Sequence, residues 1–408
     1  MRRTILHVDL DAFFCAVEEI LDPALKGVAF VVAGSPEGRG VVSSASYPAR
    51  EFGVHSAMPT AQALRLCPGL VVVRPRHHVY GEHSERVMEL LRQSVPVMEQ
   101  ISIDEAFLDV SDHPDSGERV AASLQRRIRD ELQLPTSWGV ASNRLVAKIA
   151  TNVGKPNGLV VVPADQEAGF LGPLPVGMLW GVGPKTQAVL AELGIRTIGD
   201  LASMPLEQLT ARFGDRAADL QAGARGQDDS PIEEEREARS ISNETTFARD
   251  VSDLEVLQRT LRSLVEEVGR RTREAGLGGA TVRIKLRWPD FTTITRQVRL
   301  PQATDQDGEI LSAALELLQH AWRPGAPVRL IGVGLSNLGP PSRQLSLFDH
   351  RWEEDARLLR AVDAIRARFG DEAVRRASDL PPTGPAEAPP EASPPETGST
   401  SRPPRRDG

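Results

Sequence analysis

The sequence predicts a multidomain protein that combines a mixed α/β domain, a helical part and an α+β domain. Strand-like and helix-like hydrophobic patterns interleave over residues 1–165, which is typical of a mixed α/β domain. The pattern is helical throughout 166–230, and strands and helices return over 240–338. At 408 residues the chain is long enough for two or three such domains.

The first domain is expected to open with a strand over 4–11 that ends in acidic residues. A helix over 13–21 follows, and Asp22-Pro23 is its expected end. Strands over 28–33 and 41–44 flank a glycine-bearing turn and indicate a small subdomain. The next expected elements are helices over 46–53 and 60–66, a strand over 71–74 and a long helix over 80–95.

The remaining elements of the first domain are expected as a strand over 101–110, a helix over 116–132, a strand near 137–140, a helix over 144–153 and a strand over 159–162. Ser142 is the expected N-cap of the 144–153 helix. A charged linker at 233–237 precedes the second domain.

The second domain is expected to contain strands over 240–247, 279–288, 292–300 and 328–335, with helices over 254–274 and 307–320. A further helix is expected over 352–369. The proline-rich segment 380–408 has almost no large apolar residues and is expected to be disordered.

Composition indicates a cytoplasmic protein. Hydrophobic residues make up 40% of the chain and charged residues 25%, which is ordinary for a globular protein. No apolar run approaches the roughly 20 residues that span a bilayer, and the N-terminus lacks a secretory pattern. Cys15 and Cys67 are too few for a disulfide framework, and the eight histidines show no zinc-site spacing.

The net charge of −8 argues weakly against nucleic acid, because a basic footprint is its usual sign. The distribution of charge is uneven, however. Arginines crowd the segment 259–299, whereas acids concentrate at 233–237 and in the tail.

Three carboxylates stand out near strand ends: Asp9, Asp104 and Glu105. Neighbouring side chains on a strand point to opposite faces, so Asp104 and Glu105 can share a site only if the strand ends or bends there. Carboxylates gathered in one cleft repel each other unless a cation neutralises them, and hard oxygen ligands suit Mg²⁺. The acids alone leave open a simpler interpretation, in which they terminate strands on a solvated edge.

Five segments in fixed order resemble the Y-family translesion DNA polymerases, and in particular those of bacteria. The segments are 7–14, 40–50, 102–109, 139–148 and 155–158, and the resemblance covers roughly 1–338. It implies a right-hand polymerase, with a palm at 1–20 and 75–165, fingers at 21–74, a helical thumb at 166–231, a linker at 232–239 and an α+β little finger at 240–338.

The resemblance assigns a two-Mg²⁺ chemistry to the carboxylates, in which one ion activates the primer 3′-hydroxyl and the other holds the leaving pyrophosphate. Asp9 and Asp104 match the ligands shared by both ions. Glu105 matches the ligand of the ion at the primer hydroxyl and the family's active-site acid. Asp11 lies close by but is not a ligand in the family.

Four further residues match the family's nucleotide site. Tyr47, Arg50 and Lys155 match the positions that hold the triphosphate, whose negative charge requires donors and cations. Phe14 matches the steric gate, whose ring excludes a ribose 2′-hydroxyl. Without the resemblance, Lys155 would be interpreted as a solvated lysine in a turn and Phe14 as a core residue. For Arg50, an ion pair on a helix surface would be an equally good interpretation.

Two regions match the family's DNA contacts. Gly181 and Gly183, followed by Lys185, resemble a helix–hairpin–helix element whose backbone amides bind a phosphate; the alternative is a glycine turn between packed helices. The little-finger arginine cluster supplies the other candidates, which are Arg283, Lys285 and Arg296. Some of these charges are expected to be merely solvated.

The residues Gln344, Leu345, Leu347 and Phe348 resemble the peptide by which bacterial polymerases bind the sliding clamp, the β subunit of DNA polymerase III. The alternative is that this segment packs on its own domain. Two departures from the family pattern are the helix and tail within 339–408 that follow this peptide, and Arg144, where relatives often carry lysine. Little consequence is expected from Arg144.

The sequence therefore predicts a monomeric, template-directed DNA polymerase that acts on primer-template DNA and deoxynucleoside triphosphates, passes damaged template and lacks proofreading. A two-metal nuclease would also use clustered acids, but it has no reason to keep together the four residues Phe14, Tyr47, Arg50 and Lys155. A non-catalytic clamp- or DNA-binding adaptor would be expected to have lost an acid.

Overall fold

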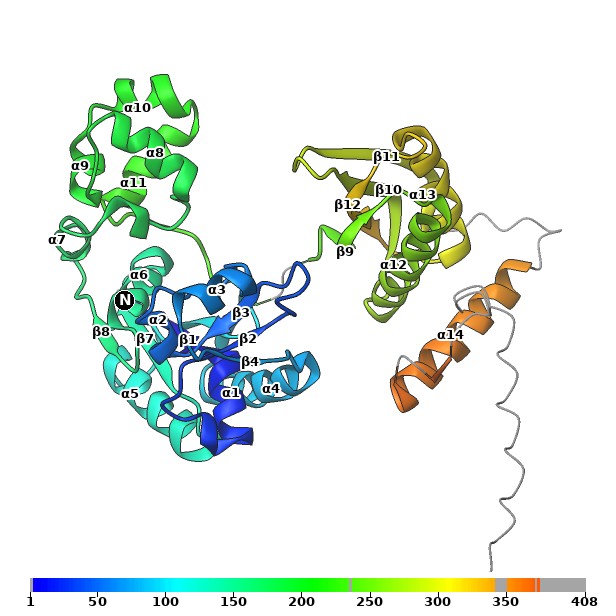
Figure 1. Cartoon of the computed structure of the whole chain (residues 1–408). Helices are drawn as coiled ribbons and strands as arrows, with labels where there is room; N and C mark the ends of the chain where they lie inside the picture. The colour runs from blue at the N-terminus through cyan, green and yellow to red at the C-terminus, as the bar shows by residue number, and fades with distance from the viewer. Residues whose placement is uncertain (1–2, 235–236, 342–350, 371–372, 375–408) are drawn as a thin grey trace, which may run out of the picture. The chain divides into compact units, whose positions relative to one another are not determined.

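The computed structural model describes residues 3–234, 237–341, 351–370 and 373–374 (Figure 1). The chain divides into two compact units, Met1–Ala238 and Arg239–Gly408. In these described ranges, no helix is both long and apolar enough to cross a membrane. The expected clamp peptide at 344–348 and the expected tail at 380–408 lie outside the described residues.

The first unit is built on a five-stranded sheet with the order β5-β6-β1-β7-β8. Its strands are β1 (Ile5–Leu10), β5 (Val97–Gln100), β6 (Glu105–Asp109), β7 (Thr136–Ala141) and β8 (Leu159–Val161). The central strand β1 pairs antiparallel with both β6 and β7. Residues from three distant parts of the sequence therefore meet at the ends of these strands.

Alternation along β1 divides its side chains between the two faces of the sheet. Leu6, Val8 and Leu10 enter a core formed with α1 (Phe13–Leu21), α4 (His77–Ser94) and α5 (Gly117–Arg127). Ile5 enters the other core, which includes α6 (Arg144–Gly154). His7 and Asp9 share the parity of Ile5, so β1 presents both on the face that α6 covers.

A glycine allows α6 to lie unusually close to the sheet. A Cβ atom at Gly139 of β7 would stand 2.0 Å from the Ala147 carbonyl oxygen and 2.8 Å from Thr151 Oγ1. Any other residue would push α6 away, because real Cβ atoms do not approach backbone this closely. The close packing brings the α6 side chains within reach of β1.

The small subdomain expected from the sequence is a three-stranded sheet with the order β3-β2-β4. It consists of β2 (Phe30–Ala33), β3 (Val42–Ala45) and β4 (Val71–Val73), with the short helices α2 (Tyr47–Arg50) and α3 (Thr60–Leu66). It has its own hydrophobic core around Val31, Ala49 and Met58.

The helical part packs on the core shared with α6. Its α-helices are α7 (Glu167–Leu171), α8 (Pro184–Glu192), α9 (Ile198–Ser203), α10 (Leu206–Phe213) and α11 (Arg216–Ala224). A capping box at Thr197 and Asp200 begins α9, which satisfies donors that the helix start would otherwise leave unpaired.

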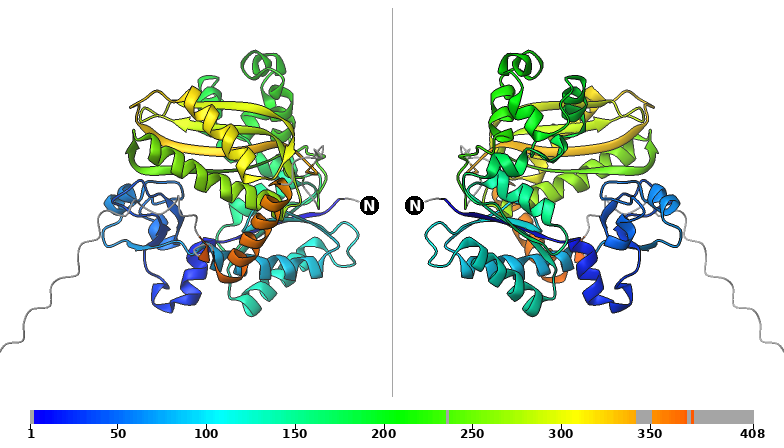
Figure 2. Two further views of the ribbon diagram at one scale, coloured as in Figure 1. Left: turned by 90° about the vertical axis from the view of Figure 1, so that its right-hand side faces the viewer. Right: turned by 90° about the vertical axis from the view of Figure 1, so that its left-hand side faces the viewer.

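The second unit is an antiparallel four-stranded sheet with the order β11-β10-β12-β9 (Figure 2). The strands are β9 (Ser240–Val251), β10 (Gly278–Arg287), β11 (Thr293–Thr304) and β12 (Val328–Gly339). One face packs against α12 (Leu254–Glu274) and α13 (Asp307–Ala321). Arg273 on α12 forms ion pairs at 2.7 Å with Asp307 of α13 and with Asp363 of a further helix, α14 (Arg351–Phe369). These pairs connect α14 to α12 and α13.

Three sequence-based expectations are wrong in detail. The helix expected over 116–132 is α-helical only to Arg127 and ends in a π turn at Ile128–Leu132. The helix expected over 46–53 is a single turn, α2. The N-cap of α6 is Asn143 and not Ser142, because Asn143 Oδ1 accepts from the Val146 amide while the Ser142 hydroxyl donates to Glu167.

Candidate active site

The end of β1 brings two of the predicted carboxylates together. Asp9 lies directly opposite Glu105 in the antiparallel register of β1 and β6, so their side chains share one face. Asp104 precedes the first residue of β6, and its carbonyl oxygen accepts from the Leu10 amide at 2.9 Å. The strand thus begins between the two adjacent acids, which is the condition the sequence required for a shared site.

Asp9 is buried and paired with a lysine. Lys155 Nζ donates to Asp9 Oδ2 at 2.6 Å, so Lys155 is not the solvated turn residue that its local sequence suggests. The pKa of Asp9 is raised to about 7, chiefly by burial and also by the neighbouring Glu105, while Lys155 acts to lower it. Burial therefore disfavours the anionic form of Asp9 despite its contact with Lys155.

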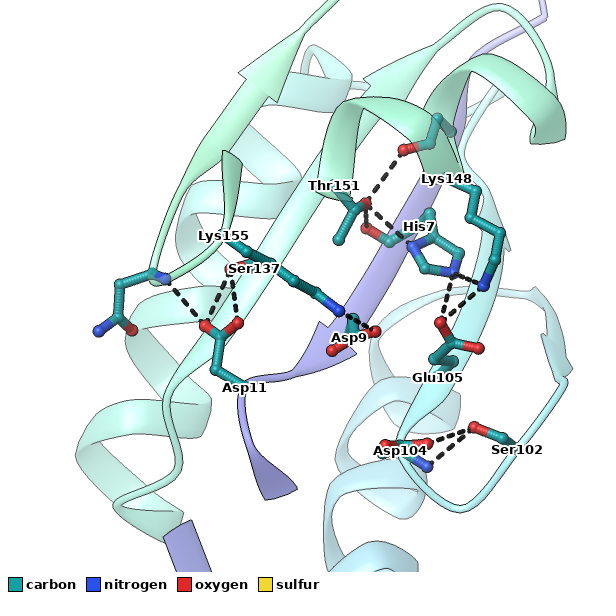
Figure 3. Close-up of polar contacts among 12 residues, drawn as sticks. His7, Asp9, Asp11, Ser102, Asp104, Glu105, Ser137, Lys148, Thr151 and Lys155 are labelled. Carbon is teal, nitrogen blue, oxygen red and sulfur yellow. Dashed lines mark hydrogen bonds and ion pairs between the residues drawn. The ribbon is translucent and has the colours of Figure 1, made fainter. Parts of the chain in front are cut away.

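Glu105 is paired with a second lysine (Figure 3). Lys148 Nζ donates to Glu105 Oε1 at 2.6 Å, and His7 Nε2 lies 3.9 Å from the same oxygen. Burial lowers the pKa of His7 well below its usual value, with further lowering by Lys148 and Lys155. His7 is therefore neutral, and Lys148 is the cation that compensates Glu105.

Asp104 has a different partner. The Ser102 hydroxyl donates to Asp104 Oδ1 at 2.5 Å and accepts from the Asp104 amide at 3.2 Å. Within the ranges that the structure describes, no three Asp, Glu, His or Cys side chains lie close enough together to hold a metal ion. Asp104 faces the site but is held by its own turn.

The donor set nevertheless fits a hard divalent cation. All three acids present carboxylate oxygens, the ligands that Mg²⁺ prefers. Asp9 and Glu105 each have an ammonium group at 2.6 Å, and the raised pKa of Asp9 shows that its anionic form is poorly compensated. A metal ion would supply the missing positive charge.

Asp11, which is not one of the expected metal ligands, connects several elements of the site. Its carboxylate is buried and accepts from the Tyr47 and Ser137 hydroxyls and from the Asn157 amide, at 3.1, 2.8 and 2.8 Å. These donors satisfy the carboxylate without a metal. Asp11 therefore fixes Tyr47 and the turn that carries Lys155.

One pocket of about 140 Å³ is lined by all four predicted nucleotide-site residues. Its lining includes the acids Asp9 and Asp104 together with Phe14, Tyr47, Arg50 and Lys155. Asp9 is on β1, Phe14 on α1, and Tyr47 and Arg50 on α2, whereas Asp104 and Lys155 lie in the turns before β6 and after α6. The structure thus brings together side chains that are up to about 146 positions apart in the sequence.

Phe14 and Arg50 each have a defined orientation in this pocket. The half-buried Phe14 ring stacks on Tyr80 with 4.3 Å between ring centres, whereas Phe13 is core at 3% exposure. Arg50 Nε donates to the Ala45 carbonyl at 3.0 Å, and its guanidinium lies 4.8 Å from the centre of the Tyr47 ring. The remaining guanidinium nitrogens can serve a planar, charged ligand.

The thumb-like helical part carries the other glycine motif. Gly181 has φ +89°, a conformation that favours glycine, and Gly183 is the extended N-cap residue of α8. Lys185 lies exposed in the first turn of α8. This geometry suits both a phosphate contact and a simple helix connection, so both interpretations of the motif stand.

The cationic residues of the second unit divide between two faces of its sheet. Arg283 and Lys285 alternate with core residues Val282 and Ile284 and therefore point to the face without helices. Arg296 lies opposite Ile284 in the register and points the other way, so it does not join them. Arg299 lies opposite Thr281, so it points to the same face of the sheet as Arg283 and Lys285.

Several side chains of this site were not found from the sequence. Contacts to the acids come from Lys148, His7 and Ser102, and the Arg144 guanidinium lies over the Phe107 ring of β6. Lys148 could have been found from its spacing, because it lies one helical turn before Thr151 on the face of α6 that packs on the sheet. Ser102 carries no such signal.

The chain matches three family models. Residues 8–152 match the impB/mucB/samB family, and residues 238–347 match the C-terminal domain of the same family. Residues 177–228 match a model described as the thumb domain of DNA polymerase-iota. Together these matches span most of both units.

Curated proteins and solved structures are similar over nearly their whole lengths. A DNA polymerase IV of Desulfatibacillum aliphaticivorans is 45% identical over 381 residues, which cover 92% of this chain and 96% of that protein. A DNA polymerase IV of Dehalococcoides mccartyi is 42% identical, with 90% and 95% coverage. A solved Y-family DNA polymerase chimera has a TM-score of 0.74 at 28% identity, and an insertion ternary complex of Dbh DNA polymerase has 0.61 at 28%; each match covers 82% of this chain and 98% of the other.

Proposed function

This chain belongs to the Y family and is a DNA-directed DNA polymerase, and we propose that it extends primers across damaged or distorted template without proofreading. The multidomain right-hand fold class expected from the sequence is confirmed by its Y-family structural relatives. For the division of the chain we propose a palm (1–20 and 75–165), fingers (21–74), a thumb (166–231), a linker (232–239) and a little finger (240–338).

The observation that carries the proposal is the pocket that joins acids and cations. Asp9 and Asp104 line it together with Arg50 and Lys155, and Glu105 lies across the strand pair from Asp9. A nuclease would need the acids alone. The added cations and the aromatic rings of Phe14 and Tyr47 suit a nucleoside triphosphate.

Y-family DNA polymerases are metal-dependent enzymes, and we assign the metal here to two Mg²⁺ ions. When bound, the ions would supply Lewis-acid activation of the primer hydroxyl and charge neutralisation at the pyrophosphate. Asp9 and Asp104 would hold both ions, and Glu105 would hold the ion at the primer hydroxyl. Asp104 would exchange its contact with Ser102 for this role.

The residues around the pocket would then orient the nucleotide. Lys155, freed from Asp9, would contact the triphosphate together with Arg50 and the Tyr47 hydroxyl. Asp11 would keep Tyr47 and the Lys155 turn in place through its hydrogen bonds. The Phe14 ring, held by Tyr80, would occupy the space of a ribose 2′-hydroxyl and favour deoxynucleotides.

Primer-template DNA would be bound through its phosphates, which give affinity without sequence preference. In the thumb we assign this to Gly181, Gly183 and Lys185, and in the little finger to Arg283 and Lys285. We assign it to Arg296 as well, which points to the opposite face of the sheet from these two residues. The similar solved structure of an insertion ternary complex of Dbh DNA polymerase supports binding of both DNA and a nucleotide.

Recruitment by the sliding clamp is part of the proposal. Gln344, Leu345, Leu347 and Phe348 would be the anchors, with α14 following them along the chain. These four residues lie outside the described part of the structure, so their sequence alone supports the role. We place the protein in the cytoplasm, as a monomer.

The decisive experiment is a primer-extension assay with purified protein, Mg²⁺ and all four deoxynucleotides, on intact template and on template with an abasic site. Extension on both templates is the expected result. A labelled primer that becomes shorter would favour the nuclease, and an unchanged primer would favour the adaptor. A mismatched primer end that is trimmed before extension would contradict the absence of proofreading.

A further inference from the structure

Lys148 lies beside the proposed metal ligands but is neither a proposed ligand nor a proposed nucleotide contact. Its side chain is 13% exposed, and Nζ donates to Glu105 Oε1 at 2.6 Å. The same ammonium group lies 3.5 Å from His7 Nε2 and 5.6 Å from the centre of the Trp180 ring. Lys148 is thus held between a carboxylate, an imidazole nitrogen and an aromatic face.

Thr151 determines which nitrogen of His7 faces Lys148. Thr151 Oγ1 lies 3.1 Å from the His7 carbonyl oxygen and 3.0 Å from that of Ala147. Its single proton goes to a carbonyl, which leaves an oxygen lone pair for His7 Nδ1 at 2.9 Å. Nδ1 therefore carries the hydrogen, and Nε2 is an acceptor aimed at the Lys148 ammonium.

The position of Lys148 is imposed by the packing of α6 on the sheet. Gly139 permits the close approach of α6, since a Cβ atom there would meet the Ala147 carbonyl oxygen at 2.0 Å. That approach places Thr151 against His7 and Lys148 against Glu105 (Figure 3). The Lys148 ammonium group is therefore held close to Glu105, with the Trp180 ring beside it.

We propose that Lys148 is a positioning residue for Glu105: it fixes the orientation of the carboxylate and compensates its charge before a metal ion arrives. The inference rests on the proposed function, in which Glu105 is a metal ligand. A contact to one carboxylate oxygen restricts the rotation of the side chain. Orientation matters because a displacement of about 1 Å in a reacting group can reduce a rate on the order of a hundredfold.

Orientation and charge make opposite contributions when Lys148 is removed. Without the lysine, Glu105 is less well oriented, so turnover becomes slower. Without its positive charge, a divalent cation no longer competes with an ammonium group for Glu105, so metal binding becomes tighter. Removal of a residue that only supports the fold would lower both the turnover and the affinity for metal.

The test compares the full-length parent with Lys148→Met, which keeps the length of the side chain and removes the charge. We expect kcat to fall about ten- to hundredfold, with the KM for the nucleotide changed less than about threefold, because the triphosphate contacts remain. Binding of Mn²⁺ alone, measured by electron paramagnetic resonance of the free ion, should be as tight as in the parent or tighter. Lys26→Met, an exposed lysine outside the site, is the matched control and should behave as the parent.

Two further variants test the geometry. His7→Phe removes the Nε2 acceptor and keeps an aromatic ring against Phe107, which lies 4.7 Å from His7. It should lower kcat less than Lys148→Met, and the double variant should lose little more than Lys148→Met alone. Lys148→Arg retains a cation at the same place and should recover part of kcat, which also covers the case in which the methionine variant does not fold.

The outcomes separate this inference from the proposed function. Normal extension by Glu105→Gln would mean that the proposed metal role itself is wrong. If Glu105→Gln is inactive while Lys148→Met has the parent's kcat, the positioning role is overturned and the proposed function stands. A raised nucleotide KM at unchanged kcat, or weaker Mn²⁺ binding, would likewise overturn it, because Lys148 would then be a substrate contact or a general support.

Discussion

The guanidinium of Arg144 and the carboxylate of Glu99 form a buried ion pair, with 3.0 Å between Nη2 and Oε1. Each partner also binds the backbone that leaves the helical part of the first unit. Arg144 Nη1 donates to the Pro231 carbonyl at 2.6 Å, and Glu99 Oε2 accepts from the Glu233 amide at 3.1 Å. The chain is therefore fixed to the first unit as far as Glu233, within the linker expected at 232–239.

This geometry predicts that Arg144→Lys is not a neutral change, contrary to the expectation from sequence. A lysine head group lacks the planar fork that reaches Glu99 and Pro231 together, so one buried acceptor should lose its partner. We expect a loss of about 1–3 kcal/mol in the free energy of unfolding of the first unit, measured by urea denaturation. Arg127→Lys, at the exposed pair with Glu131, is the matched control and should change it by less than about 0.5 kcal/mol.

Amide hydrogen exchange should locate the effect of Arg144→Lys. Faster exchange confined to the segment that contains Ser230 to Glu233 would agree with release of the chain from Arg144 and Glu99. Unfolding free energies and exchange rates equal to those of the parent would contradict the role of this pair.

The features that could be predicted from the sequence are those that depend on residues adjacent in the chain. Alternation along 4–11 was sufficient to separate Leu6 and Val8 from His7 and Asp9, because side-chain direction on a strand has a period of two. The break between Asp104 and Glu105 was also predictable, because two adjacent acids cannot share a face within a regular strand.

What could not be predicted depends on packing and register. The pair of Lys148 and Glu105, 43 residues apart, exists because α6 approaches the sheet at Gly139. The direction of Arg296 depends on how β11 is aligned with β10, where the register shifts between Gly279 and Thr281. Asn143 and Ser142 are both good N-cap residues, and only the contact of Ser142 with Glu167 separates them.

The carboxylates provide the second prediction. Glu105→Ala or Asp104→Ala should abolish primer extension, because each change removes a ligand of the proposed metal site. Thermal melting in the absence of metal should show that both variants fold, since each removes one negative charge from a group of mutually repelling acids. Turnover close to that of the parent in either variant would contradict the assignment.

The pKa of Asp9 predicts how the stability of the metal-free protein depends on pH. Burial raises this pKa from 3.8 to about 7. Between these pH values the folded protein therefore keeps the Asp9 proton, whereas the unfolded chain has released it. The contribution of Asp9 to stability therefore declines as the pH rises from about 4 to about 7. Asp9→Asn should raise the melting temperature at pH 8 and leave it nearly unchanged at pH 4. An equal gain at both pH values would show that the pKa is not raised.

Phe14 provides a prediction about sugar selection. Phe14→Ala should keep deoxynucleotide incorporation and increase ribonucleotide incorporation at least tenfold, about 1.4 kcal/mol of lost discrimination, because the ring that stacks on Tyr80 no longer fills the space of the 2′-hydroxyl. Single-nucleotide insertion kinetics with the two sugars measures the ratio. Phe13→Ala is the contrasting control, since Phe13 is core and its loss should lower the melting temperature without a matching change in discrimination. An unchanged ratio in Phe14→Ala would make Phe14 a core residue only.

The last prediction concerns the clamp. Leu347 and Phe348 are large apolar residues in a segment otherwise rich in polar and turn residues, which indicates a partner surface. Burial of two such side chains contributes on the order of 1.5–3 kcal/mol each, so replacing both with Ala should weaken clamp binding at least about tenfold. Extension without the clamp should hardly change, because the peptide follows the last strand of the second unit, β12.

The competing explanation is that these two side chains pack on their own domain under α14. The structure provides α14 with other partners, since Ala356 and Leu359 are buried and Asp363 and Arg366 pair with Arg273 and Glu266. Asp363→Ala should therefore lower the melting temperature of the second unit, whereas the double Leu347, Phe348 change should not. Melting temperature and clamp-stimulated extension, measured on the same preparations, separate the two explanations. A double variant that melts at a lower temperature and keeps full stimulation by the clamp would mean that the two side chains pack on their own domain. Lost internal packing would lower the stability, and stimulation by the clamp would not depend on these residues.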